Sequence, residues 1–241
     1  MRIAIVSDIH GNRTAFEAVL ADLRAMSPDL ILHGGDLADS GSSPAEIVDH
    51  IRYLGWPGVV GNTDEMLTTP ESLEEFAKPS PHLHHLFATI REMAEATREA
   101  LGKERLEWLR ALPLQQIEAP IALVHATPLS PWQAPKPDAG DDELLSIYGT
   151  LGQKIAVHGH IHRPYVRRLR EMAIVNTGSV SLSYDGDKRV SYLLLNDGEP
   201  EIRRVEYDVD KEAAALFNSK FPHAQWVVNM LRNATFRMPQ G

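Results

Sequence analysis

IAIVSDIH, residues 3–10, joins an apolar run to a polar end that contains Asp8 and His10. Continuous apolar runs of this kind are typical of strands that are buried on both faces, as in a parallel sheet covered by helices. Similar apolar runs occur at 30–32, 58–60, 121–124 and 155–157. Helical patterns separate the first three runs, since one apolar stripe extends from Phe16 to Met26 and a second helix begins at Ser43-Pro44 and ends at Gly55. The order β-α-β-α-β therefore predicts an α/β fold.

The rest of the chain has a helical part, a proline-rich part and an antiparallel part. Residues 65–113 carry no strand pattern and are expected to form a helical insertion that is interrupted at Gly102. Residues 128–140 contain four prolines and are expected to form a loop that contacts substrate. Apolar runs at 173–175, 190–195 and 202–207 predict antiparallel strands, and residues 210–241 predict a helical pair. No repeat or linker divides the sequence, so we expect residues 1–241 to form a single domain.

Composition excludes several kinds of protein and site. Of the 241 residues, 43% are hydrophobic and 24% are charged, as in an ordinary globular protein rather than a disordered chain. The absence of cysteine excludes disulfides, thiolate metal sites and cysteine nucleophiles. The formal net charge of −9 argues against nucleic acid and anionic membranes as partners. No signal peptide and no apolar stretch of roughly 18 residues is present, so we expect a cytoplasmic location.

The buried runs end in residue types that bind metal ions. The candidates are Asp8, His10, Asp36, Asn62, His125, His160 and His162. Because ligands of open α/β sheets bind at the carboxyl ends of the strands, we expect these side chains to meet in one crevice. Seven donors exceed what one tetrahedral ion uses and suit two ions that share a carboxylate. The glycines before Asp36, Asn62 and His160 are expected to allow tight turns. Carboxylate together with imidazole suits manganese, iron or zinc better than calcium.

The candidates form five motifs in a fixed order. These are Asp-x-His at 8–10, Gly-Asp-x-x-Asp at 35–39, Gly-Asn-x-Asp at 61–64, His125, and Gly-His-x-His at 159–162. Together they resemble the calcineurin-like metallophosphoesterases, and most closely the small prokaryotic branch that includes phosphodiesterases and some diadenosine tetraphosphate hydrolases. The resemblance implies a four-layer αββα sandwich with two mixed β-sheets and a dinuclear metal site at their shared edge.

The resemblance also implies a role for each matched residue. Asp8, His10 and His162 would hold one ion, Asn62, His125 and His160 would hold the second, and Asp36 would bridge both. A hydroxide between the two divalent ions would attack phosphorus in line, which makes Asp36, Asn62 and His125 catalytic as well as metal-binding. Manganese is the expected metal, with iron, zinc or nickel as alternatives. Asp39 and Asp64 would orient ligands by hydrogen bonds, or would only begin a turn and cap a helix.

Three residues are candidates for substrate contact. Asn12 and Arg13 stand at the expected start of a helix, where an N-terminus and a guanidinium suit a phosphate. The alternative for Arg13 is an exposed side chain on the first turn. Thr63 stands where many family members have a histidine that stabilises the transition state or protonates the leaving group. A hydroxyl is too weak an acid to replace imidazole, so we expect a preference for good leaving groups.

The sequence therefore predicts a metal-dependent phosphoric ester hydrolase. Its substrate would be a small, nucleotide-like molecule whose phosphodiester or phosphoanhydride bond is cleaved. Two alternatives keep the same fold: a non-catalytic scaffold, and a nucleotide sensor that binds metal and ligand but turns over slowly. Whether the C-terminal helices form a homo-oligomer interface is left open by the sequence.

Overall fold

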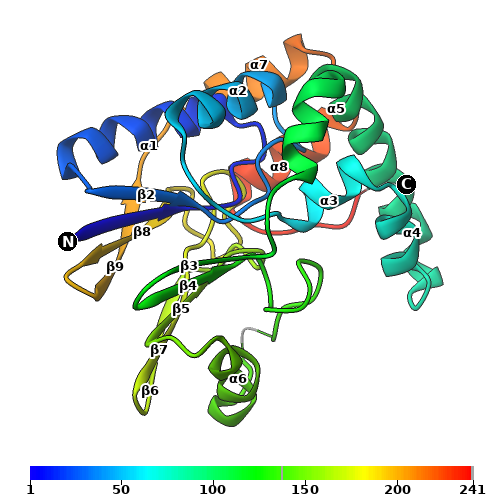
Figure 1. The fold of residues 1–241 in the computed structure, drawn as a ribbon. Helices are drawn as coiled ribbons and strands as arrows, with labels where there is room; N and C mark the ends of the chain where they lie inside the picture. The colour runs from blue at the N-terminus through cyan, green and yellow to red at the C-terminus, as the bar shows by residue number, and fades with distance from the viewer. Residues whose placement is uncertain (137, 240–241) are drawn as a thin grey trace.

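Two β-sheets lie against each other in the computed structural model, which describes residues 1–136 and 138–239 (Figure 1). The first sheet has the order β2-β1-β8-β9 and contains β1 (Arg2–Val6), β2 (Leu30–His33), β8 (Val190–Asn196) and β9 (Glu199–Val205). The second has the order β3-β4-β5-β7-β6 and contains β3 (Gln115–Glu118), β4 (Ile121–Val124), β5 (Ile155–His158), β6 (Tyr165–Leu169) and β7 (Met172–Asn176). Each sheet has parallel and antiparallel neighbours, for example β1 with β2 and with β8, and β7 with β5 and with β6. The predicted α/β fold with two mixed sheets is confirmed.

Helices cover the outer face of each sheet, which gives four layers (Figure 1). α1 (Arg13–Met26) and α2 (Pro44–Leu54) lie on the first sheet, and α6 (Asp141–Tyr148), which continues into the 3₁₀ turn Gly149–Leu151, lies on the second. In β1, Ala4 and Val6 belong to the core beneath α1, whereas Ile3 and Ile5 belong to the core between the sheets. Because both faces of β1 are buried, its sequence is a continuous apolar run without alternation.

The core between the sheets is entirely aliphatic. Strands of both sheets contribute to it, namely through Ile3, Ile5, Leu32, Ile121, Leu123, Ile155, Val157, Val175, Leu193 and Leu195, together with Val59. These side chains are all buried. The packing of these aliphatic side chains fixes how the two sheets face each other, and an exposed ion pair between Arg168 of β6 and Glu199 of β9 also joins the sheets.

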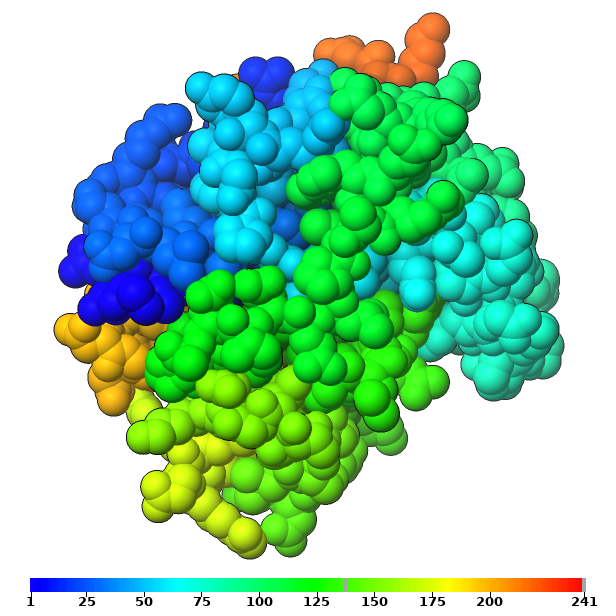
Figure 2. Space-filling view, in the orientation of Figure 1, coloured from blue at the N-terminus to red at the C-terminus, as the bar shows by residue number. Residues whose placement is uncertain are grey.

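A group of helices flanks one side of the two sheets. It consists of α3 (Asn62–Thr68), α4 (Glu71–Ala77), the 3₁₀ turn Pro81–Leu83, α5 (His84–Arg110), α7 (Val209–Asn218) and α8 (Ala224–Asn233). The backbone of Gly102 inside α5 is not helical, with φ 66° and ψ 174°, as expected from its place in the sequence. Leu216, Val227 and Leu231 of the C-terminal helices pack in one cluster with Met93 of α5. In the space-filling view, α4 and the adjoining end of α5 form the right-hand edge of the molecule (Figure 2).

The structure differs from the sequence prediction in a few short segments. Residues 58–60, predicted as a strand, make a single bridge between Gly58 and His33, because the N–H of Val60 bonds instead to the carbonyl of Pro113. β3 and α6 form where no element is predicted, since β3 is a sheet edge with alternating exposure and α6 has only eight residues. Residues 128–136 and 138–140 contain no helix or strand, as expected for the proline-rich loop, and Pro137 lies outside the described residues. Among the described helices, none combines the length and apolar character that a membrane crossing requires.

Candidate metal centre

Four buried side chains from three loops direct metal-binding atoms towards one point. Asp8 and His10 follow β1, Asp36 follows β2 and His162 follows β5. One ligand atom of each lies within 4.8 Å of the others, and each residue is at most 4% exposed. The carboxyl ends of strands from both sheets therefore meet at one edge, which is where open α/β sheets bind ligands.

A second group of donors adjoins the first. The Oδ1 atom of Asn62 lies 3.0 Å from Nε2 of His125 and 2.8 Å from Nδ1 of His160. Asp36 lies between the two groups, since its Oδ2 atom is 3.6 Å from Nε2 of His10 and 3.5 Å from Nε2 of His125. The structure thus brings together all seven side chains that the sequence selects, with Asp36 in the shared position.

The ring nitrogens of His10 and His162 have an arrangement that suits a cation. Nδ1 of His10 lies 3.0 Å from the carbonyl oxygen of Asp39, and Nδ1 of His162 lies 2.6 Å from that of Leu182. A carbonyl only accepts, so each Nδ1 carries the proton and each Nε2 presents a lone pair. These two Nε2 atoms lie 3.2 Å apart, so two lone pairs face each other. Metal-binding histidines are oriented in this way by carbonyl groups, and the donor set therefore fits a divalent ion.

Five of the seven side chains stand on left-handed backbone. The angle φ is 56° at Asp8, 49° at His10, 54° at Asp36, 68° at His160 and 54° at His162. Residues other than glycine rarely adopt this conformation, and each instance costs about 1–3 kcal/mol. The surrounding fold must therefore hold these loops in place, which is typical of a functional site.

Asp64 ties together the loops that carry Asp36 and Asn62. Its Oδ2 atom accepts from the N–H groups of Asp36 (2.8 Å) and Gly61 (3.0 Å), and its Oδ1 atom accepts from that of Leu37 (3.0 Å). Burial raises the pKa of this carboxyl to about 6, and the neighbouring Asp36 acts in the same direction. Asp64 thus orients the loop that carries Asp36, in addition to capping α3.

Asp39 acts on His10 in a similar way. Its backbone carbonyl fixes the His10 ring, while its buried carboxylate accepts from Ser40 Oγ and Thr97 Oγ1, each at 2.9 Å. Asp39 also stands in a turn with Ser40, so the turn that the sequence suggests is present together with the contact to His10.

Burial favours the neutral form of two imidazoles of the site, those of His10 and His160. It lowers the pKa of His10, and it lowers the pKa of His160 to about 4, because the charged form would lose its hydration. Burial opposes ionisation of Asp8, but the pKa of this carboxyl is held well below its usual range when the neighbouring His162, whose Nε2 lies 3.1 Å from Oδ1, is protonated; a cation bound between these two groups would act in the same direction. Neutral imidazole and ionised carboxylate are the forms that bind metal ions.

The family follows from a match over most of the chain. Residues 1–198 match the family model of the "Calcineurin-like phosphoesterase superfamily domain". The chain belongs to this superfamily. The resemblance seen in the motifs is therefore confirmed, and the buried Asp/His cluster is the metal-site cluster of a metallophosphoesterase.

This calcineurin-like phosphoesterase is similar to other proteins along nearly its whole length. Uncharacterized protein MJ0912 from Methanocaldococcus jannaschii is 33% identical over 248 residues, which cover 93% of this chain and 95% of the relative. The crystal structure of a metallophosphoesterase from Sphaerobacter thermophilus has a TM-score of 0.80 at 25% identity and covers 98% of this chain and 100% of its own. Hypothetical protein PH1004 from Pyrococcus horikoshii OT3 shares the fold, with a TM-score of 0.84 at 18% identity over 98% of this chain and 99% of its own.

Arg13 is the one predicted site residue that the structure places away from the metal centre. Its guanidinium pairs with Glu17 at 2.7 Å and lines a separate surface hollow together with His50 and Tyr53. The first turn of α1 directs this side chain towards solvent, which is the arrangement of the alternative stated for Arg13.

The other two predicted substrate contacts stand at the N-terminal ends of two different helices. Asn12 is buried and caps α1, because its Oδ1 accepts from the N–H of Ala15 at 2.9 Å. Thr63 lines the cavity beside the metal-binding side chains, and its N–H donates to Oδ1 of Asp36 at 2.9 Å. The hydroxyl of Thr63 is buried and has no hydrogen-bond partner among the described residues.

Tyr184 is a residue of the site that sequence reasoning missed. Its ring stacks on the ring of His162, with centroids 4.7 Å apart and planes 17° apart. It lies in the loop between β7 and β8, where no spacing pattern marks it as part of the site. Only the fold brings it there.

Proposed function

We propose that the protein is a dinuclear-metal-dependent phosphoesterase that hydrolyses phosphodiester or phosphoanhydride bonds of small, nucleotide-like substrates. Asp8, His10 and His162 would hold one ion, and Asn62, His125 and His160 the other. The observation that carries the proposal is the position of Asp36, whose Oδ2 atom lies 3.6 Å from His10 Nε2 and 3.5 Å from His125 Nε2, between the two groups. We propose manganese first, with iron, zinc or nickel as alternatives, because carboxylate together with imidazole suits ions of this kind better than calcium.

Backbone groups around the site orient the side chains that would bind the metal ions. When bound, two such ions would lower the pKa of a water molecule and neutralise charge on the phosphate. The N–H of Thr63 donates to Oδ1 of Asp36, which leaves Oδ2 directed at the donors on both sides. Backbone carbonyls hold the protons of His10 and His125 on Nδ1, so that Nε2 of each ring is available as a ligand.

Thr63 sets a limit on the leaving group. A hydroxyl cannot supply a proton near neutral pH, so the leaving alcohol must depart as the anion or take its proton from solvent. Nucleoside polyphosphates and aryl esters have leaving groups of that kind. This supports a preference for activated esters over simple alkyl esters.

Metal removal and a single substitution test the proposal. We expect the chelated protein to lose hydrolysis of an aryl phosphodiester and to regain it with Mn²⁺. The variant Asp36→Ala should lose nearly all turnover and should retain fewer metal ions per chain in elemental analysis. Asp49→Asn, which removes an exposed carboxylate that pairs with Arg105, is the matched control and should keep both properties. Full turnover by the Asp36→Ala variant would contradict the proposal.

A nucleotide sensor of the same fold is a second candidate, and Thr63 is the residue that favours it. Such a sensor would bind nucleotide tightly and hydrolyse it slowly, because no general acid would protonate the leaving group. Single-turnover hydrolysis measured beside nucleotide affinity separates the two functions. A hydrolysis step that is faster than nucleotide release would identify an enzyme.

A further inference from the structure

A mostly apolar cavity of about 210 Å³ opens directly from the metal centre. Five of the seven metal-binding candidates line it, namely His10, Asp36, Asn62, His160 and His162. Its other walls come from α3, α4, α5, α8, the proline-rich loop and the C-terminal segment. A phosphate held at the metal centre would therefore point its ester group towards this cavity.

Two groups of aromatic side chains form much of the apolar wall. In the first, the rings of Phe76 and Trp132 lie 4.9 Å apart between centroids, and Phe87 meets Phe76 edge-on at 6.2 Å. In the second, Phe236 meets Tyr184 edge-on at 5.8 Å and lies 6.3 Å from Trp226. Rings packed in these ways offer both faces and edges to another ring.

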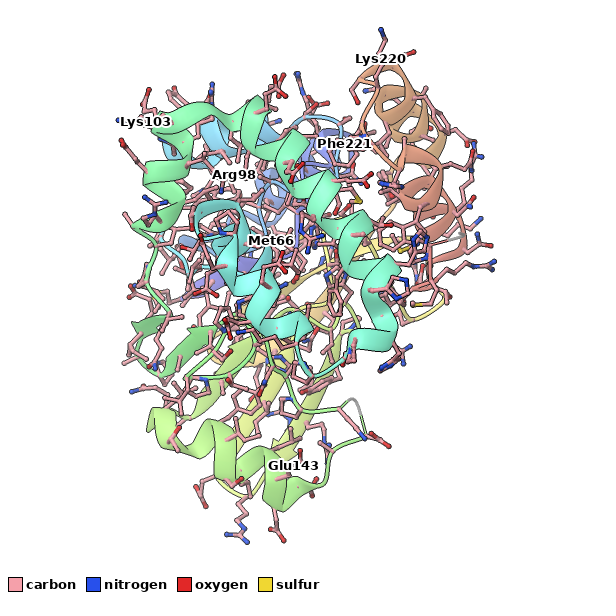
Figure 3. The ribbon with its side chains drawn as sticks, turned by 90° about the vertical axis from the view of Figure 1, so that its right-hand side faces the viewer. Met66, Arg98, Lys103, Glu143, Lys220 and Phe221 are labelled. Carbon is pink, nitrogen blue, oxygen red and sulfur yellow. The ribbon has the colours of Figure 1, made fainter. Side chains whose placement is uncertain are left out.

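The cavity has no cationic side chain with which to hold additional phosphates. Among the described residues that line it, none is lysine or arginine, and its carboxylates are those of Asp36 and Asp39. Arginines of the surrounding helices are committed elsewhere, since Arg91 pairs with Glu74 and Arg98 donates to the carbonyl of Leu67. Figure 3 shows Arg98 and the cavity residue Met66 on the side of the molecule where α4, α5 and α8 gather.

We propose that this cavity is a subsite for one uncharged ring group esterified to a single phosphate, and that it selects against polyphosphate chains. The proposal rests on the proposed function, since it assumes that the phosphate sits at the metal centre. The volume suits one ring system, because a cavity of roughly 150 Å³ accommodates benzene. A second or third phosphate would bring charge against apolar walls, where charge is costly without a partner.

Binding of simple phosphate monoesters tests the subsite without turnover. We expect the Mn²⁺-loaded protein to bind phenyl phosphate roughly 10-fold or more tightly than methyl phosphate in calorimetric titration, because the two differ only in a buried ring. Tripolyphosphate should bind more weakly than phenyl phosphate. Equal affinities for phenyl and methyl phosphate, or tighter binding of tripolyphosphate, would overturn the proposal.

Two variants locate the effect in the cavity. Phe76→Ala and Phe236→Ala remove rings that are 39% and 43% exposed, so the fold should tolerate both changes. Each should reduce the ratio of phenyl to methyl phosphate affinity several-fold. Phe217→Ala is the matched control, because this ring on α7 is 46% exposed and does not line the cavity. An unchanged ratio in both cavity variants would place the ring elsewhere and refute the assignment.

Hydrolysis separates failure of the subsite from failure of the proposed function. With metal restored, kcat/KM should be higher for 4-nitrophenyl phenyl phosphate than for a dinucleoside tetraphosphate. If no ester is hydrolysed while phenyl phosphate is still bound selectively, the proposed function is wrong and the subsite stands. If the tetraphosphate is the better substrate, the enzyme is confirmed and the subsite is refuted.

Discussion

Substituting alanine for Gly61 should damage the metal centre without changing any of its side chains. Gly61 has φ −95° and ψ 171°, an extended backbone that alanine adopts readily, so the substitution adds a methyl group and no backbone strain. A carbon built at this position would lie 2.8 Å from Cγ of Asp36 and would overlap its Oδ1 atom. The effect is therefore one of space, beside the shared carboxylate and beside the backbone nitrogen of Asp36, which the added carbon would also overlap.

The size of the effect follows from the distance. Non-bonded carbon atoms rest about 3.5–4.0 Å apart, so Asp36 or the Gly61 loop must move by roughly 1 Å. A displacement of about 1 Å in a catalytic arrangement costs about 100-fold in rate. Overpacking of a buried site also costs about 1–3 kcal/mol of stability. For a chain of this length, that corresponds to a fall in Tm of about 2–12 °C.

Steady-state hydrolysis of an aryl phosphodiester with Mn²⁺, together with thermal unfolding, measures both effects. Gly149→Ala is the matched control, because Gly149 has φ −61° and no atom within 4 Å of the added carbon. This control should change neither rate nor Tm appreciably. A Gly61→Ala variant with kcat/KM within twofold of the parent protein would refute the argument that this glycine exists to make room for Asp36.

Three further predictions follow from other parts of the structure. Arg13→Ala should leave kcat/KM within twofold, because the guanidinium pairs with Glu17 on the surface; a loss of 10-fold or more in steady-state assays would return Arg13 to the site. Burial, with a smaller contribution from Asp36, raises the pKa of Asp39 to about 6 in the folded protein, so this carboxyl makes the metal-free protein less stable as pH rises from about 4 to 7. The side chain that replaces the carboxyl in the Asp39→Asn variant cannot ionise. In urea denaturation, the free energy of unfolding of this variant minus that of the parent protein should therefore rise by about 3 kcal/mol between about pH 4 and pH 7. A difference that stays constant with pH would contradict the assigned pKa. The third prediction concerns a series of aryl methyl phosphates, measured where chemistry limits the rate. In the parent protein kcat should fall steeply as the pKa of the leaving group rises, and in the Thr63→His variant it should fall less steeply. A flat dependence in the parent protein would show that no general acid is missing.

The metal-binding candidates could be predicted because a residue that directly follows a buried strand in the sequence also lies at the end of that strand in the fold. Each follows an apolar run, and the carboxyl ends of parallel strands meet at one edge. The glycines were harder to interpret from sequence. Gly35 has φ 85° and serves a turn, as expected. Gly61 and Gly159 instead leave room for Asp36 and Asp8, a requirement that only the packed structure reveals.

Residues outside the strand ends were beyond the reach of sequence patterns. The side of a helical turn that faces a site depends on how the helix is placed, which is why the sequence leaves two alternatives for Arg13, substrate contact and an exposed surface position; the structure has the side chain on the surface. The cavity walls come from segments far apart in the chain, such as Phe76, Trp132 and Phe236, and no spacing rule links them. Their pairing depends on tertiary packing of α4, the proline-rich loop and the C-terminus.

The aliphatic core between the two sheets has a consequence for the chemistry. Asp8, His10 and Asp36 are carried by one sheet, whereas His125, His160 and His162 are carried by the other. Neither sheet carries a complete set of donors. The distance between the donors of one sheet and those of the other therefore depends on how far apart Ile5, Val157 and their neighbours hold the two sheets. Loss of a single methyl group deep in that hydrocarbon layer, remote from any phosphate, would shift one half of the donor set against the other.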